Sequence, residues 1–282
     1  MNTRSTPGRW FAAPVAVFMM LCFAAPILIV TWYSLMPSRT FGLTGDLTLE
    51  NYRSAFTDGY GRPLMWSLMG AATTTVVTAI LAWPTAVILH RYAGKWASVT
   101  SALIALPIFI SESVRLFGMS VFLMPRGGIL AGTLNAVFGI QIGSIMNTWA
   151  AAQFGMIYIH LPFMLFPLLL GISLIPADRI EAARDLGANR WQSFREIELP
   201  LAAPGLMIGA LLTFVLCLGA NAEAAILGGR AVTVITAAIE QRFNYAQDWP
   251  MGAALTVIVI AVTALIVLPV LSRLDLNKLT GR

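Results

Sequence analysis

The chain has 282 residues, of which 58% are apolar and only 11% are charged, and it carries a net charge of +5. A soluble globular domain usually has about 25% charged residues, so this composition excludes a soluble fold. The apolar core of a bilayer is about 30 Å thick and needs about 20 helical residues to cross it. At least five stretches of the chain meet this requirement, which predicts an all-α integral membrane protein.

Six membrane spans are predicted, one of them only if its polar residues face other helices. The first span follows Arg4 and Arg9, as a cleaved signal peptide would. Its apolar run of about 26 residues is longer than the 7–15 residues of a signal core, which favours a retained helix. No internal repeat or linker divides the chain, so we expect one membrane domain over residues 1–282. The predicted spans are 11–36, 64–89, 98–124, 145–175, 201–220 and 251–272.

Two segments between spans, 37–63 and 221–250, are long enough to hold short surface helices. Thr48 is a candidate cap for a helix in the first of them, because a threonine oxygen can accept a bond from a free amide at a helix start.

The positions of the basic residues predict the orientation. Of the 18 Lys and Arg residues, eleven fall on the side of the N-terminus, six on the opposite side and one, Arg115, within a span. Cytoplasmic loops carry an excess of such residues, so both termini and the polar segment 176–200 are expected in the cytoplasm. The positive net charge therefore reflects orientation, and no basic groove with stacking aromatics indicates a nucleic-acid partner.

The segment 176–200 has local signals for two helices joined by a sharp bend. Pro176 and Asp178 are typical of a helix start, where proline fits and an acid meets the positive end of the dipole. Gly187 is suited to a left-handed helix stop. Asn189 can cap the next helix, with Gln192 three residues on. The apolar face of this second helix would carry Trp191, Phe194 and Ile197.

The same segment reads E-A-A-x3-G-x9-I-x-L-P, from Glu181 to Pro200. This spacing resembles the signature of the membrane subunit of bacterial ABC importers, where the loop docks on the ATPase subunit. The alternative is a polar loop that merely connects two spans. The resemblance implies a docking role for Glu181, Ala182, Ala183, Asp185, Leu186, Gly187, Trp191, Phe194, Ile197, Leu199 and Pro200.

Further segments are similar to the spermidine/putrescine-type permeases: 106–118, 161–163, 228–229 and 247–254. The resemblance implies a six-helix permease of the type I importer fold in the bacterial inner membrane. It also implies four kinds of partner: a second homologous permease, two ATPase subunits that bind ATP and Mg, a periplasmic substrate-binding protein and membrane lipid. The expected substrate is a polyamine or a similar small solute, but relatives of this type also move opines, phosphonates and ferric iron.

Several charged or polar residues are candidates for the solute path or its gate. Glu112 and Arg115 lie within a predicted span, where a charge is costly and usually paired or exposed to a water-filled path. Their spacing allows a salt bridge on one helix face, so a purely structural pair is the alternative. Asn221, Glu223 and Asp248 lie at the outer ends of the last two spans, where the alternative is an ordinary solvated loop.

The sequence contains no recognisable catalytic motif. It has no phosphate-binding G-x-x-x-x-G-K-[ST] loop, and its two histidines, His90 and His160, lack the HExxH spacing of a zinc enzyme. Both cysteines fall within spans and are expected to behave as small apolar residues. We therefore expect no catalytic residue, no metal site and no cofactor on this chain. An ion-driven transporter would need inverted repeats with broken helices, and an intramembrane hydrolase would need a nucleophile beside a base; neither pattern is found.

Overall fold

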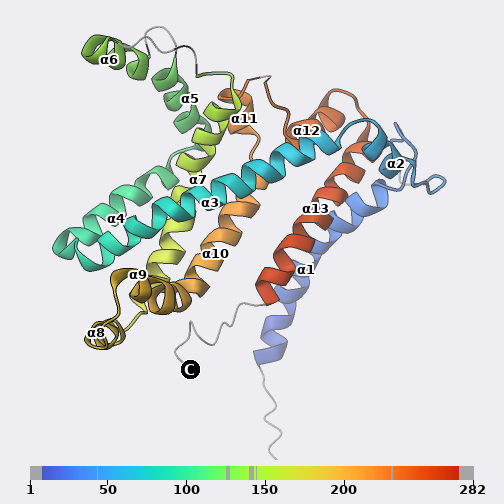
Figure 1. Ribbon diagram of the computed structural model, residues 1–282. Coiled ribbons are helices and arrows are strands. Elements are labelled where there is room, and N and C mark those ends of the chain that lie inside the picture. Colours follow the sequence, from blue (N-terminus) through green and yellow to red (C-terminus); the bar gives the residue numbers. More distant parts are fainter. Residues whose placement is uncertain are drawn as a thin grey trace, which may run out of the picture. The chain divides into compact units, whose positions relative to one another are not determined.

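Helices connected by loops make up the residues that the computed structural model describes, which are 8–42, 44–124, 128–139, 143, 145–229 and 231–272 (Figure 1). No strand occurs among these residues, which confirms the all-α prediction. Both extreme termini, and with them Arg4, lie outside the described residues.

Five described helices are long and apolar enough to cross a bilayer. They correspond to five of the six predicted spans, with boundaries shifted by a few residues. One of them, α10, continues directly from the preceding short helices, so that residues 190–218 form one helical rod of 29 residues. The five are α1 (Gly8–Tyr33), α3 (Gly61–Arg91), α7 (Trp149–Ser173), α10 (Leu199–Leu218) and α13 (Trp249–Ser272).

The remaining predicted span, 98–124, is divided into two helices in the structure. Two helical arms, 94–109 and 112–123, meet at an angle of 101° and give a sixth crossing only if they count as one broken span. Pro107 has no amide hydrogen to donate and its ring clashes with the preceding turn, so the helix tightens into a 3-10 turn and stops. Ile110 is then extended, with φ −97° and ψ 136°, before the second arm begins at Glu112. These arms consist of η1 (Gly94–Trp96), α4 (Ala97–Ala105), η2 (Leu106–Phe109) and α5 (Glu112–Leu123).

The shorter helices, except α6, lie in segments where the sequence predicted short helices. The helix in segment 37–63 begins at Glu50, one residue later than a Thr48 cap would place it, although the Thr48 hydroxyl still accepts from the Glu50 amide at 3.1 Å. These helices are α2 (Glu50–Thr57), α6 (Ile129–Phe138), α8 (Ala177–Asp185), α9 (Arg190–Ser193), the π-helical turn η3 (Phe194–Glu198), α11 (Ala222–Ile226) and α12 (Ile235–Asn244).

The chain divides into two compact units, one formed by residues 1–61 and 237–262 and the other by residues 62–236 and 263–282. In the first unit, the segment after α1 folds around Asn51. Its side-chain amide donates to the carbonyls of Ser34 and Met36, at 3.1 and 2.7 Å. This buried amide therefore fixes the turn between α1 and α2.

In the second unit, α7 packs along α10, and Figure 1 shows the two side by side. The contact depends on small residues, because Gly171 and Gly205 bring the two backbones together at a point where neither could carry a Cβ without a close contact. Such close approach is typical of helices in a bilayer, where packing of small residues drives association. The surrounding core includes Met164, Leu168 and Ala202, all fully buried.

Candidate functional site

The bent loop 176–200 is built by local capping, as the sequence predicted. Pro176 precedes the first helical residue of α8, Asp178 lies in the first turn, and Arg184 lies in the last. The helix ends at Gly187, whose φ of +87° is left-handed. The Gly187 amide donates to the Arg184 carbonyl at 2.9 Å, which closes the helix end. Glycine adopts this left-handed conformation without a steric clash because it has no Cβ.

The second half of the loop begins with a capping box. The Asn189 side chain accepts from the Gln192 amide, and the Gln192 side chain accepts from the Asn189 amide, both at 2.9 Å. The helix then widens into the π-helical turn η3 before α10 starts. Pro200 cannot donate to the carbonyl one turn earlier, so the hydrogen-bond ladder is already interrupted at this point.

The outer surface of the loop combines exposed apolar side chains with an open pocket. Leu186 is 90% exposed and Trp191 is 66% exposed, although both are large and apolar. A pocket of about 440 Å³ lies between α8 and the start of α10. Five of the predicted docking residues are among those that line it: Ala182, Ala183, Leu186, Ile197 and Pro200.

The other predicted docking residues lie elsewhere on the loop. Trp191 stacks near Phe194, with ring centroids 5.3 Å apart, and Phe194 packs edge-on against Trp83 of α3 at 5.1 Å. Asp185 is exposed, Leu199 is half-buried, and Gly187 has open space around it. Phe194 therefore anchors the loop to α3, while the exposed residues remain available for a partner.

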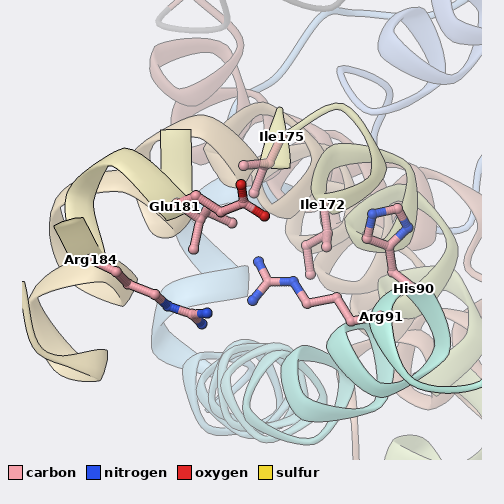
Figure 2. Close-up of a pocket in the computed structure, with 7 residues that line it drawn as sticks. His90, Arg91, Ile172, Ile175, Glu181 and Arg184 are labelled. Carbon is pink, nitrogen blue, oxygen red and sulfur yellow. The ribbon is translucent and has the colours of Figure 1, made fainter. Parts of the chain in front are cut away.

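Glu181 lines a second, smaller pocket of about 190 Å³ on another side of α8. Figure 2 shows Arg91 of α3 and Arg184 of α8 extending toward one another in this pocket. Arg91 also forms an ion pair with the largely buried Glu198 of η3, with Nη1 and Oε1 3.0 Å apart. Sequence reasoning did not find this contact, which ties the end of α3 to the loop.

A second group of candidate residues lies inside the same unit, around Glu223 of α11. Glu223 is 0% exposed, so the solvated-loop alternative is wrong for this residue. Its Oε1 lies 3.8 Å from Nδ1 of His160, and that nitrogen is 2.8 Å from the Met156 carbonyl oxygen. The association of His160 with Glu223 was not foreseen from the sequence.

Glu112 and Arg115 do not form the salt bridge that their spacing allows. No ion pair within 4.0 Å joins them in the described structure. Glu112 is exposed at the start of α5, whereas Nε and Nη1 of Arg115 are buried and meet no hydrogen-bond acceptor there. Both residues belong to α5, which packs against α11, the helix of Glu223, and against α7, the helix of His160. The unit therefore contains one loose polar cluster, formed by Glu112, Arg115, His160 and Glu223.

The two remaining candidates are placed differently. Asn221 is half-buried just before α11. Asp248 belongs to the other unit and is only 5% exposed, so it too is not part of a solvated loop. It accepts from the Ser38 hydroxyl at 2.8 Å, from the Arg39 amide at 3.1 Å and from the Met251 amide at 3.4 Å. These bonds fasten the segment after α1 to the start of α13, which accounts for its burial in structural terms.

The fold and the capped loop together define a multi-pass membrane permease subunit. Residues 80–274 match the family of binding-protein-dependent transport system inner membrane components, and the chain belongs to this family. The spermidine/putrescine transport system permease protein PotB of Haemophilus influenzae is 32% identical over 238 residues, which are 84% of this chain and 82% of the relative. PotB of Escherichia coli is 32% identical over 251 residues, 86% of this chain and 91% of the relative.

Solved structures agree on the fold. A chain of a bacterial alginate ABC transporter, in complex with a periplasmic protein that carries an alginate pentasaccharide, superposes with a TM-score of 0.76. The match covers 93% of this chain and 91% of the other, at 17% sequence identity. The predicted type I importer permease fold and inner-membrane, multi-pass character are thus confirmed, and the family is one of transport permeases.

Proposed function

We propose that this chain is the permease subunit of an ATP-driven importer whose substrate is a polyamine such as spermidine or putrescine. The similarity to the PotB proteins extends over more than four fifths of both chains. The polar cluster around Glu223 supports the same substrate class, because it contains two acids and one arginine. Opines, phosphonates and ferric iron are the alternatives that related permeases suggest.

The observation that carries the proposed coupling role is the exposed apolar surface of the loop 176–200. A side chain such as Leu186, 90% exposed beside an open pocket, is typical of a surface that a partner covers. ATP and Mg would bind to two ATPase subunits that dock here. Closure of the ATPases would draw the loop inward and switch the spans between two arrangements. This chain then supplies the solute path and the mechanical link, with no catalytic residue or cofactor of its own.

The complete importer would also contain a second homologous permease and a periplasmic binding protein. Glu112, Arg115, Asn221 and Glu223 would contribute to the path or its gate, whereas Asp248 would act by shaping the outer end of α13. Both termini and the loop 176–200 would lie in the cytoplasm, as the excess of Lys and Arg on that side predicts.

A labelling experiment tests this orientation. Single cysteines at Arg190 and Asp58, both exposed, are introduced into a variant that lacks Cys22 and Cys217. In intact spheroplasts an impermeant thiol reagent should label the Asp58 position and leave the Arg190 position unlabelled until the membrane is opened. Labelling of the Arg190 position in sealed spheroplasts would rule out the cytoplasmic docking loop.

An uptake assay tests the substrate and the energy source. Cells that lack their own polyamine importers, and that express the complete transporter, should accumulate labelled putrescine or spermidine. Accumulation should stop when ATP is depleted while the ion gradient is kept. Uptake that follows the ion gradient would instead favour a secondary transporter, and the absence of polyamine uptake would exclude the proposed substrate class.

A further inference from the structure

Glu223 is the most deeply buried acid among the described residues, and its carboxylate lacks partners. Neither oxygen meets a hydrogen-bond donor on another described residue, and the His160 nitrogen at 3.8 Å is too far to serve as one. A buried carboxylate without hydrogen bonds lowers the stability of the folded protein, because burial removes its water without replacing the hydrogen bonds that the water made. In a membrane protein, a buried acid of this kind usually marks a solute or ion path.

Other acceptor atoms without donors occur in the same unit. The side-chain oxygen Oε1 of Gln153 on α7 and the hydroxyl of Thr213 on α10 are buried and have no hydrogen-bond partner in the described structure. The helix of Gln153, α7, packs against α10, which carries Thr213, and against α11, which carries Glu223. The side-chain amide of Gln153 donates to the Thr74 hydroxyl. Thr213 and Cys217 are one turn apart on the same face of α10.

The packing of short helices fixes the position of Glu223. Gly155 of α7 leaves space for Leu227 of α11, and a Cβ at Gly155 would also approach Leu116 of α5 at 3.4 Å and Glu223 itself at 3.7 Å. The Asn147 amide donates to the Leu227 carbonyl at 2.8 Å, which secures the end of α11. The acid is therefore held between α5 and α7 by the packing of α11 rather than by bonds to its own carboxylate.

The charge and the bonding capacity of this region select one kind of ligand. Glu223 and Glu112 carry two negative charges against the one positive charge of Arg115, so one further cation would balance them. Apart from the nitrogens of Arg115, the unfilled positions of Glu223, Gln153 and Thr213 can each accept a hydrogen bond, and an ammonium group offers three N–H donors. An anion would add repulsion, and an uncharged apolar solute would leave the acceptors unfilled.

We propose that Glu223, with the side-chain oxygens of Gln153 on α7 and Thr213 on α10, binds a positively charged amine of the transported solute as it passes. This inference rests on the proposed function, because it assigns the polyamine of that importer to these residues. Arg115 opposes the binding from α5 and weakens it, so that the amine is released rather than trapped.

The test uses the complete transporter in lipid nanodiscs, without its binding protein, and measures equilibrium binding of labelled putrescine. Glu223→Gln should weaken binding at least about tenfold, since the lost charge acts across a low-dielectric region. Arg115→Gln should strengthen it several-fold, an effect of opposite sign that a purely structural role does not produce. Glu50→Gln, which changes an exposed acid of α2, should bind putrescine as the wild type does.

Four outcomes of these measurements would contradict the proposed amine site. Wild-type affinity in Glu223→Gln, in a transporter that imports putrescine, would overturn the amine site and leave the proposed function intact. Full recovery of binding in the double variant Arg115→Gln, Glu223→Gln would also overturn it, because the two residues would then be a structural pair. A wild-type transporter that neither binds nor imports any polyamine would overturn both proposals. If Glu223→Gln does not assemble, Thr213→Val replaces one acceptor by a methyl group, and unchanged binding there would count against the site.

Discussion

Replacing Gly187 with valine is expected to abolish transport while the chain still inserts into the membrane. Gly187 has a φ of +87°, which a β-branched residue adopts only at a cost of about 1–3 kcal/mol. The helix end would shift to relieve this strain and break the bonds that the Gly187 and Ala188 amides make to the last turn of α8. The exposed Leu186 and the capping box at Asn189 would then point away from their present positions. Putrescine uptake and ATPase activity stimulated by the binding protein should both fall to background.

Asparagine at position 187 is the matched control. Asparagine tolerates the left-handed conformation better than other residues with a Cβ. No atom lies within 4 Å of the position that a Cβ would take at Gly187, so steric contact with neighbouring residues does not complicate the comparison. Gly187→Asn should therefore retain most of the uptake. Normal uptake in Gly187→Val, at a normal ratio of permease to ATPase subunits in the purified complex, would show that the loop does not depend on this stop.

The loop could be predicted from the sequence because its structure depends on neighbouring residues. Pro176 fits a helix start, Gly187 permits a left-handed stop, and the side chain and amide of Asn189 bond with those of Gln192. Each of these signals acts over four residues or fewer. The six apolar stretches were recognisable for a similar reason, since length and hydropathy are properties of one segment.

The bend in the predicted span 98–124 could not be found by counting apolar residues. A proline such as Pro107 is tolerated in many membrane helices, where neighbouring helices satisfy the freed carbonyl. Five described helices contain internal prolines and still count as single spans, among them α7 with Pro162 and Pro167. The difference lies in the extended residue Ile110 that follows, and nothing in the local sequence specifies it.

The residues that contact the buried charged side chains could also not be predicted from the sequence. Arg91 donates to Glu198, which lies 107 residues later in the chain, and Ser38 donates to Asp248, which lies 210 residues later. Glu223 was expected at the outer end of a span, but α11 folds back between α5 and α7 and buries it. Such contacts depend on how helices distant in the chain pack together, and one sequence contains no direct sign of that packing.

The link between the loop and the spans follows from the continuity of residues 190–218. Because α9, η3 and α10 follow one another as one continuous helical segment, a displacement of Trp191 is expected to be transmitted to α10. The Arg91–Glu198 ion pair and the Trp83–Phe194 contact join the same rod to α3. The loop is therefore mechanically connected to two long helices of its unit.

Replacing Gly205 with valine is expected to separate α7 from α10 and to prevent stable assembly. A Cβ at this position would lie 2.9 Å from the Cα of Gly171 and 3.0 Å from its amide nitrogen, and closer still to the Pro167 carbonyl. These are backbone atoms, which cannot move aside as a flexible side chain can. Overpacking of this kind costs about 1–3 kcal/mol for small changes and more where the backbone must shift. The variant should be recovered in low yield, and its thermal unfolding midpoint should fall by several degrees.

Gly132→Ala provides the control for this last variant. Gly132 lies within α6 and has open space where a Cβ would be placed. Alanine favours a helix over glycine by about 1 kcal/mol, so this variant should be as stable as the wild type or slightly more so. Both variants are compared by thermal unfolding of the detergent-solubilised permease and by the yield of assembled complex. Equal stability of Gly205→Val and Gly132→Ala would show that α7 and α10 do not approach as closely as the contact between Gly171 and Gly205 requires.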